Sequence, residues 1–385
     1  MTLEISPLPN ALLGQCGDLG SRAQGLSRKL KLCFLANANS SHTAKWVNYF
    51  CSKGHEVHLL SFDAGRDIAP EVFVHILKSQ LGPSLRYFLA ARQVRDIIKE
   101  IRPDLLHAHY ASGYGTLGRL AEFHPYALSV WGSDVFAVPF RSPFHKRLVE
   151  RNLASADQVC STSQFMADHT RQYCDRPITV TPFGVDCERF RPLEARSCSL
   201  NEFVVGTVKN LESASGVELL IRSFAIAAGK YRSGEKLRLV IAGEGVLRKP
   251  LERLTDDLGI QSQTTFLGFV PHGKVPELLG TFSVFAMLSL RESFGVAVLE
   301  ASSCGVPVIV TNIGGLSEVV QDGITGMVVP PRDPEAAAAA LCTLAEDAGL
   351  RRKLGAGGRE FVLREYEWSE NATRMEQVYK AVLNH

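Results

Sequence analysis

The chain has 385 residues, of which 45% are hydrophobic and 21% are charged, and its formal net charge is +2. This composition is typical of a globular protein and excludes a disordered or fibrous chain. The length exceeds what one hydrophobic core usually supports, so we expect two domains. We expect no nucleic-acid partner. Since no run of 18 apolar residues occurs, we also expect no transmembrane helix.

The N-terminus and the cysteines indicate the compartment. Residues 1–28 contain several Gly and Pro without clear periodicity, so we expect a loose extension there. The same segment lacks the basic and apolar regions of a secretory signal. Nine cysteines without a C-x-x-C pair favour reduced thiols over a disulfide framework or a zinc site. We therefore expect a cytoplasmic protein.

Short apolar or β-branched segments alternate with helical patterns along the chain. Near-continuous apolar strands separated by helix-length intervals are typical of parallel strands that are covered on both faces. The sequence therefore predicts an α/β fold with two Rossmann-like, doubly wound domains that face each other across a cleft. In chain order the expected strands lie in KLCFLANA, HEVHLLSF, DLLHAHYA, YALSVWGS, QVCSTS, ITVTPFG, EFVVGTV, RLVIAGEG, TTFLGFV, SVFAMLS, PVIVTN and GMVVPP.

A polar segment separates the two sets of strands. Arg191 to Phe203 loses the apolar periodicity, which places the domain boundary near residue 196. We expect an N-terminal domain at 29–195 and a C-terminal domain at 196–369.

The two halves of the chain differ in charge. Residues 1–196 carry a net charge of +5 and the remainder carries −3. The positive charge concentrates in two helical stretches, Leu85 to Pro103 and Phe140 to Leu153, which also contain aromatic residues. Such helices bind an anionic membrane or face an anionic acceptor, although a solvated helix face is the commoner outcome.

Two histidines follow each other on one expected strand of the first domain. His107 and His109 lie two positions apart and therefore face the same way. A metal pair is conceivable, but no further Cys, His or carboxylate at ligand spacing completes it. His109 lies nearer the end of the strand, so we interpret it as a catalytic-site contact to the acceptor or a sugar.

The loops that follow strands of the second domain offer groups for an anionic ligand. Gly206 and Lys209 follow EFVV, while Gly243 follows LVIA with Arg248 about one helical turn later. A lysine serves a diphosphate as a mobile point charge and an arginine as a fork. Further along, the glycines of TNIGGLSE either admit a ligand close to the backbone or form a simple β-to-α turn.

The most informative segment is RESFGVAVLE, which places Glu292 and Glu300 on either side of a Ser-Phe-Gly corner. If that corner opens a helix, its free N–H groups make a seat for a diphosphate. Glu292 would then accept hydrogen bonds from sugar hydroxyls, and Glu300, about two turns into the helix, from a ribose. An amphipathic helix with a solvated Glu at each end is the alternative. The donor-binding candidates of this corner are Ser293, Phe294, Gly295, Val296 and Glu300.

The flanks of this segment carry a family resemblance. SLRESFGVAVLEASSCGVPVIVTNIGGLSEVVQDGITGMVVPP resembles the donor-site half of the family 4 retaining glycosyltransferases (group 1) of GT-B architecture. PFGVDCERFRP and VVGTVKNLE are similar to the segments that close the first domain and open the second in that family. The resemblance also implies that the C-terminal helix, residues 370–385, packs back on the first domain. Its apolar side carries Ala372, Met375, Val378 and Val382, and a Ser cap precedes it.

The resemblance assigns roles to further residues and also shows departures. A basic pair neutralises the leaving phosphates in this family; Lys209 matches one member, whereas Ala214 stands where relatives have the other. Trp131 occupies the place of a family histidine, so no catalytic histidine carries over there. The loop NANSSH lies where relatives have paired glycines. On this basis the acceptor-side candidates are Asn39, His42, Trp131, Gly132 and Asp134.

The resemblance implies transfer of a sugar from a nucleoside diphosphate sugar to a hydroxyl acceptor with retention of configuration, with catalysis by Glu292, Lys209 and His109 and without a metal or other cofactor. A non-catalytic sugar-nucleotide binding protein or partner subunit is the alternative that the changes at Ala214 and Trp131 favour. A nucleotide-sugar epimerase or a dinucleotide oxidoreductase is a third, although no G-x-G-x-x-G follows Phe34.

Overall fold

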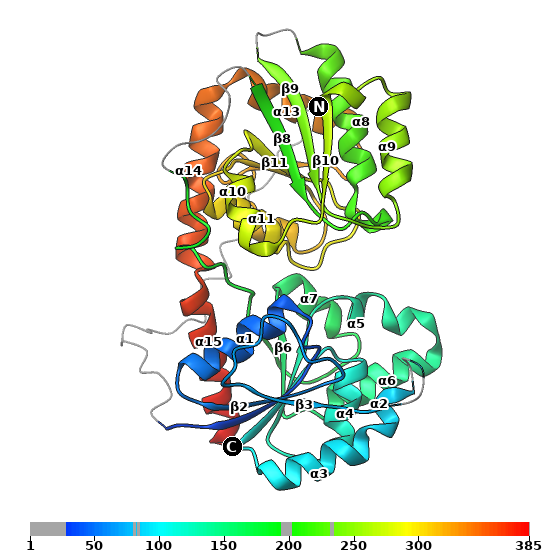
Figure 1. The fold of residues 1–385 in the computed structure, drawn as a ribbon, viewed down its shortest axis with the longest axis vertical. Helices are drawn as coiled ribbons and strands as arrows, with labels where there is room; N and C mark the ends of the chain where they lie inside the picture. The colour runs from blue at the N-terminus through cyan, green and yellow to red at the C-terminus, as the bar shows by residue number, and fades with distance from the viewer. Residues whose placement is uncertain (1–27, 80–81, 83–84, 194–201, 232–234, 385) are drawn as a thin grey trace, which may run out of the picture.

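A computed structural model describes residues 28–79, 82, 85–193, 202–231 and 235–384. It contains two α/β units, each built on one parallel sheet (Figure 1). The predicted boundary near residue 196 and all of the predicted N-terminal extension except Arg28 lie outside the described residues.

The first unit holds a seven-stranded sheet in the order β3-β2-β1-β4-β5-β6-β7. Every neighbouring pair is parallel, and the order reverses between β1 and β4, as in a doubly wound fold. The strands are β1 (Lys31–Leu35), β2 (Glu56–Ser61), β3 (Phe73–Ile76), β4 (Leu105–His109), β5 (Tyr126–Val130), β6 (Gln158–Ser161) and β7 (Ile178–Val180). The helices are α1 (Ser41–Ser52), α2 (Arg86–Leu89), α3 (Ala91–Ile101), α4 (Gly113–Ala121), α5 (Ser133–Phe136), α6 (Pro143–Ala154) and α7 (Gln164–Thr170), with a 3-10 helix at Val138–Arg141.

The second unit repeats this pattern with a six-stranded sheet in the order β10-β9-β8-β11-β12-β13. Its strands are β8 (Glu202–Val208), β9 (Lys236–Ala242), β10 (Thr264–Gly268), β11 (Val284–Met287), β12 (Val308–Thr311) and β13 (Met327–Val329). Its helices are α8 (Val217–Lys230), α9 (Arg248–Asp257), α10 (Val275–Leu279), α11 (Val296–Ser303), α12 (Leu316–Val319), α13 (Pro334–Glu346) and α14 (Ala348–Glu365), with 3-10 helices at Ser213–Ser215, Gln261–Gln263 and His272–Lys274.

The predicted fold class and every predicted strand are confirmed. The central strands are buried on both faces, and all five residues of β4 and β5 lie in the interior, which is why they appear as apolar runs. Strand β3 was not predicted. It forms the edge of the first sheet, and Phe73 at its start is 55% exposed.

The C-terminal helix α15 (Trp368–Leu383) continues from α14 and lies along the first unit (Figure 1). Tyr49 of α1 donates a hydrogen bond to Glu376 at 2.8 Å, and Tyr379 bonds to His107 of β4 at 2.5 Å. The four predicted apolar positions of this helix are all buried. Its cap differs from the prediction, because the Glu367 carboxylate accepts the N–H groups of Ser369 and Glu370 while Ser369 lies inside the first turn.

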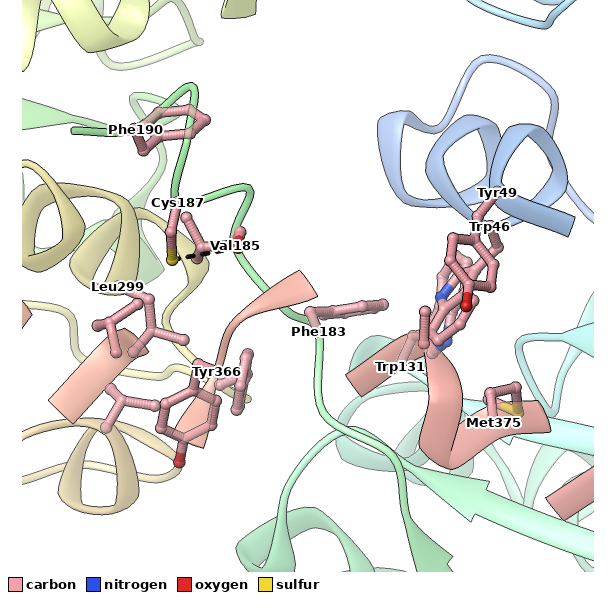
Figure 2. Close-up of a cluster of buried hydrophobic side chains, with 14 of the residues drawn as sticks. Trp46, Tyr49, Trp131, Phe183, Val185, Cys187, Phe190, Leu299, Tyr366 and Met375 are labelled. Atoms are coloured by element: carbon pink, nitrogen blue, oxygen red, sulfur yellow. Dashed lines mark hydrogen bonds between the residues drawn. The ribbon is translucent and has the colours of Figure 1, made fainter. Parts of the chain in front are cut away.

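Two chain crossings run side by side between the units. Val185 pairs with Glu367, and its N–H donates to Tyr366 O at 2.7 Å. Figure 2 shows Phe183 between Trp131 of the first unit and Leu299 with Tyr366 of the second. This buried cluster holds the units against each other. Among the described residues, no helix combines the length and apolarity needed to cross a bilayer.

Candidate active site

A pocket of about 230 Å³ lies between the two units, beyond the carboxyl ends of β5, β8 and β11. Ligands of doubly wound folds bind at this edge of the sheet. The first unit contributes Gly132, Ser133, Phe136 and Ala137 to the lining. The second contributes Lys209, Asn210, Glu212, Ala214, Ser215, Arg291, Glu292 and Ser293.

An ion pair between Lys209 and Glu292 forms part of the pocket wall. Lys209 Nζ donates to one carboxylate oxygen of Glu292, and the other oxygen accepts the N–H of Ser293 at 3.1 Å. The two side chains are 23% and 13% exposed, so the pair is shielded but open to the pocket. Two predicted residues from loops that lie 83 positions apart are thus brought together.

Glycines position both members of this pair. Gly243 has φ 138°, and a Cβ there would lie 1.9 Å from the carbonyl oxygen of Lys209. A Cβ on Gly314 would lie 2.0 Å from the carbonyl oxygen of Glu292, and one on Gly315 2.4 Å from that of Ser293. These glycines let backbone pack on backbone. Gly243 therefore packs against the backbone of Lys209. The glycines of TNIGG allow a close contact with the backbone of Glu292 and Ser293, not with a ligand.

The Ser-Phe-Gly corner precedes α11 as predicted, with Gly295 as the N-cap residue at φ 108°. Ser293 lines the pocket, and its carbonyl accepts from Ser163 of the first unit at 3.0 Å. Phe294 is buried against Phe183, so it anchors the corner instead of contacting a ligand. Val296 is half-buried and packs on the core. Val298 N–H donates to Gly295 O at 3.0 Å, so only the N–H groups at the very start of α11, those of Val296 and Ala297, are left for an anion.

Glu300 lies on the same helix but does not line the pocket. It is buried, and its Oε1 accepts a hydrogen bond from His272 at 2.8 Å. It stands little more than one turn after Val296, nearer the helix start than predicted. Glu300 also faces the first unit, since its charge acts on Lys45 of α1, whose pKa burial lowers to about 8. His272 was not predicted, because no feature of the sequence links it to Glu300.

Two predicted donor contacts, Gly206 and Arg248, lie outside the pocket lining. Gly206 lies inside β8, where a Cβ would come within 2.1 Å of the Phe282 ring, so its role is packing. Arg248 pairs with Glu244 at 3.1 Å and with Glu252 at 2.5 Å, each one helical turn away. Neither residue lines the pocket. The position of each residue at or after a strand suggested a ligand contact. In the structure Gly206 packs against Phe282, and Arg248 forms ion pairs with its helical neighbours.

His109 is also misplaced for a direct contact. It is 1% exposed, and its ring lies 4.2 Å from that of Trp131, which covers it. Within the described ranges neither ring nitrogen has a hydrogen-bond partner. Its neighbour His107 bonds through one nitrogen to Tyr379 and through the other to Ser129, so the pair leaves no nitrogen of His107 for a metal.

The remaining acceptor-side candidates divide into one pocket residue and four that lie around it. Gly132 lines the pocket at φ 140°. Asp134 is fully buried and accepts the N–H groups of Ala111 and Gly132, both at 2.8 Å, so it orders the loop. Burial raises the pKa of Asp134, against these hydrogen bonds. His42 stacks on Phe183 at 4.0 Å, Trp131 is buried beside them, and Asn39 is exposed outside the pocket.

A carboxylate that links the two units was also missed. Glu318 accepts the N–H groups of Gln164 and Phe165 at the start of α7 in the first unit, the former at 2.9 Å. Glu318 lies 154 and 153 positions from these residues, so local sequence patterns do not connect them.

Comparison with known proteins places the chain in a family. Residues 194–361 match the model of Glycosyl transferases group 1, and residues 31–163 match Glycosyl transferase 4-like. The chain is 30% identical over 309 residues to D-inositol 3-phosphate glycosyltransferase of Salinispora arenicola (strain CNS-205), covering 72% of this chain and 68% of the relative. This chain is a group 1 glycosyltransferase.

Solved structures show the same architecture for this glycosyltransferase. Sucrose-phosphate synthase from Thermosynechococcus elongatus matches with a TM-score of 0.81 at 20% identity, covering 93% of this chain and 100% of that one. HepE from Anabaena in complex with UDP matches with a TM-score of 0.77 at 20% identity, covering 91% and 100%. The glycosyltransferase therefore has the GT-B fold, as predicted.

Proposed function

We propose that this glycosyltransferase moves a sugar from a nucleoside diphosphate sugar to a hydroxyl acceptor with retention at the anomeric carbon. Lys209, Glu292 and Ser293, which lies three residues before α11, share one wall of the pocket opposite residues of the first unit, and this placement carries the proposal. The UDP complex of HepE supports a nucleotide-sugar donor. The named activity of the Salinispora relative supports a hydroxylated acceptor.

The reaction breaks the bond between the anomeric carbon and the leaving phosphate oxygen while the acceptor oxygen bonds to the same face of that carbon. The proton of the acceptor hydroxyl passes to the leaving phosphate, so the products are a glycoside and a nucleoside diphosphate. Negative charge develops on the diphosphate during this step. Lys209 and the first-turn N–H groups of α11 would stabilise it, and a pre-arranged donor of this kind contributes about 3 to 4 kcal/mol.

The ion pair in the pocket wall suggests how the donor engages. Lys209 is held by Glu292. A diphosphate that attracts Lys209 also releases an oxygen of Glu292, which becomes free to accept hydrogen bonds from sugar hydroxyls. When Lys209 exchanges Glu292 for the diphosphate, Lys209 would bind the phosphates and Glu292 would become free to bind the sugar.

A thermal-shift screen with UDP, GDP, ADP and dTDP sugars tests the proposal. A ligand at 100 times its dissociation constant stabilises the protein by about 2.7 kcal/mol. We expect one base to stand out. No shift with any of the four would overturn the donor assignment, whereas binding without transfer to a broad acceptor panel would indicate a non-catalytic binding protein, which the covering of His109 by Trp131 would then explain.

The two glutamates are expected to affect different steps. Glu300→Ala should weaken binding of the bare nucleoside diphosphate because we assign Glu300, with His272, to the ribose. Glu292→Ala should mainly lower sugar transfer. Isothermal titration with the nucleoside diphosphate separates the two, and Glu277→Ala, at an exposed ion pair of the same unit, is the control. Unchanged nucleotide affinity in Glu300→Ala would remove the ribose assignment.

Transfer activity is expected to persist in EDTA, because Lys209 and helix-end N–H groups supply the positive potential that a divalent ion gives in other transferases. The initial rate should be the same before and after dialysis against chelator. A loss of rate that Mg²⁺ or Mn²⁺ restores would contradict this mechanism.

A membrane contact is proposed for the basic helices α3 and α6. Phe144 of α6 and Phe140 of the preceding 3-10 helix are 64% and 69% exposed, and Lys146 and Arg147 of α6 are exposed as well. Sedimentation with liposomes should therefore increase with anionic lipid content and decrease from low to high salt. If the protein does not bind liposomes, or binds them equally at low and high salt, α3 and α6 are solvated surface helices and not a membrane contact.

A further inference from the structure

Two of the charged residues that line the pocket form an ion pair with each other, whereas Arg291 does not pair with a described residue. Lys209 and Glu292 neutralise each other as an ion pair. Arg291 lines the same pocket and is exposed, and its guanidinium forms neither a hydrogen bond nor an ion pair with any residue in the part of the chain that the structure describes. The pocket therefore carries a positive charge, on Arg291, that no described residue neutralises.

The backbone fixes Arg291 at this wall. The N–H groups of Leu290 and Arg291 both donate to the carbonyl of Ala214, at 2.9 and 3.3 Å. Gly216, at φ 67°, lets this loop pack on the next strand end, since a Cβ there would lie 1.8 Å from the carbonyl oxygen of Leu288. Arg291 and the uncharged Ala214 are thus adjacent on one rigid loop pair, and both line the pocket.

An isolated cation on a pocket wall needs a ligand that matches it. A guanidinium stays charged at all accessible pH values and binds two oxygens of a phosphate through parallel N–H groups. A nucleoside diphosphate brings more than one negative charge, whereas Lys209 is already shared with Glu292. The pocket thus has chemistry for a second contact to phosphate.

We propose that Arg291 binds the diphosphate of the donor as the second cation of the site, entering from the wall that bears Ala214. This inference rests on the proposed function. It gives Arg291 a direct role that the sequence pattern alone does not predict. An anionic acceptor would offer the same phosphate chemistry, so the test separates the two sources.

Isothermal titration with UDP, GDP, ADP and dTDP provides the test. Arg291→Ser should weaken the nucleoside diphosphate that binds best by about ten- to a hundred-fold, the range for a charge-assisted contact, without changing affinity for the corresponding nucleoside. Arg291→Lys should fall in between because it keeps the charge and loses the fork. Arg352→Ser, at an exposed position of α14, is the matched control and should bind as the unmodified protein does.

A double variant tests position as well as charge. Because Ala214 and Arg291 are neighbours on the wall, Ala214→Lys introduced into Arg291→Ser should recover part of the lost affinity. Since Arg291 is exposed, its replacement should leave the melting temperature unchanged, so weaker binding would not reflect unfolding.

The outcomes are distinct. If the unmodified protein binds none of the four diphosphates, the proposed function fails and the inference fails with it. If it binds one, and Arg291→Ser binds that one equally well, only the inference is overturned. A raised KM for the acceptor with unchanged nucleoside diphosphate affinity would likewise overturn it, by assigning Arg291 to the acceptor.

Discussion

Replacing Lys209 with alanine is expected to lower the turnover number about a hundred- to a thousand-fold, the usual cost of removing one pre-arranged donor to a developing negative charge. Lys209 is the member of the ion pair that faces the leaving diphosphate in the proposed mechanism. Its removal also leaves the Glu292 carboxylate, 13% exposed, without its cation, which opposes the approach of a diphosphate.

These two effects are separable by measurement. Turnover at saturating donor should be compared between Lys209→Ala and the double variant Lys209→Ala/Glu292→Gln, in which the orphaned charge is absent. The double variant should regain nucleotide affinity but not turnover. Lys274→Ala removes an exposed lysine of the same unit and serves as the control. Intact binding and turnover in Lys209→Ala would place the phosphate site elsewhere on the protein.

Acid is expected to destabilise the protein strongly because two histidines are buried uncharged. His107 and His109 are each 1% exposed; burial lowers the pKa of His107 to about 3 and that of His109 well below its ordinary value. The unfolded chain, with histidine pKa near 6.5, therefore binds more protons than the folded one as pH falls below that value. Stability is present above about pH 6.5 and is lost on acidification, by about 2 kcal/mol per histidine between pH 7 and pH 5.

Urea unfolding at pH 7 and pH 5 measures this loss, which should total about 4 kcal/mol for the two residues. His42, whose pKa burial lowers to about 4, adds to it with the same sign. In His109→Phe the difference between the two pH values should shrink by about 2 kcal/mol, because the replaced ring no longer takes up a proton. Its stability at pH 7 should be retained, since the ring nitrogens of His109 bond to no described residue. An unchanged pH dependence in this variant would show that His109 is protonated in the folded protein.

The fold was readable from the sequence because buried parallel strands leave continuous apolar segments. LLHAH of β4 and YALSV of β5 are buried at all five positions, whereas the four residues of FVHI in β3 are exposed or half-buried at a sheet edge, and this strand was missed. The corner before α11 was also readable, since a carboxylate, a glycine and the start of an apolar helix occur within the five residues from Glu292 to Val296.

The site was readable only in part, because spacing along the chain does not reveal which partner a side chain finds. Arg248 and Asp134 look like ligand contacts in sequence, yet carboxylates one turn away hold the first and backbone N–H groups surround the second. The pairing of Glu300 with His272 and the bond from Ser163 to Ser293 join residues 28 and 130 positions apart. Such contacts depend on how loops and units close on each other, which local patterns do not encode.

We expect the pocket between the units to hold the donor, with its diphosphate against Lys209 and the start of α11. A crystal structure of the protein with the nucleoside diphosphate that stabilises it most would test this directly. It should show phosphate density within hydrogen-bonding distance of Lys209 Nζ and of the first N–H groups of α11, with Lys209 turned from Glu292 toward the ligand. Diphosphate density at any other place on the protein would contradict it.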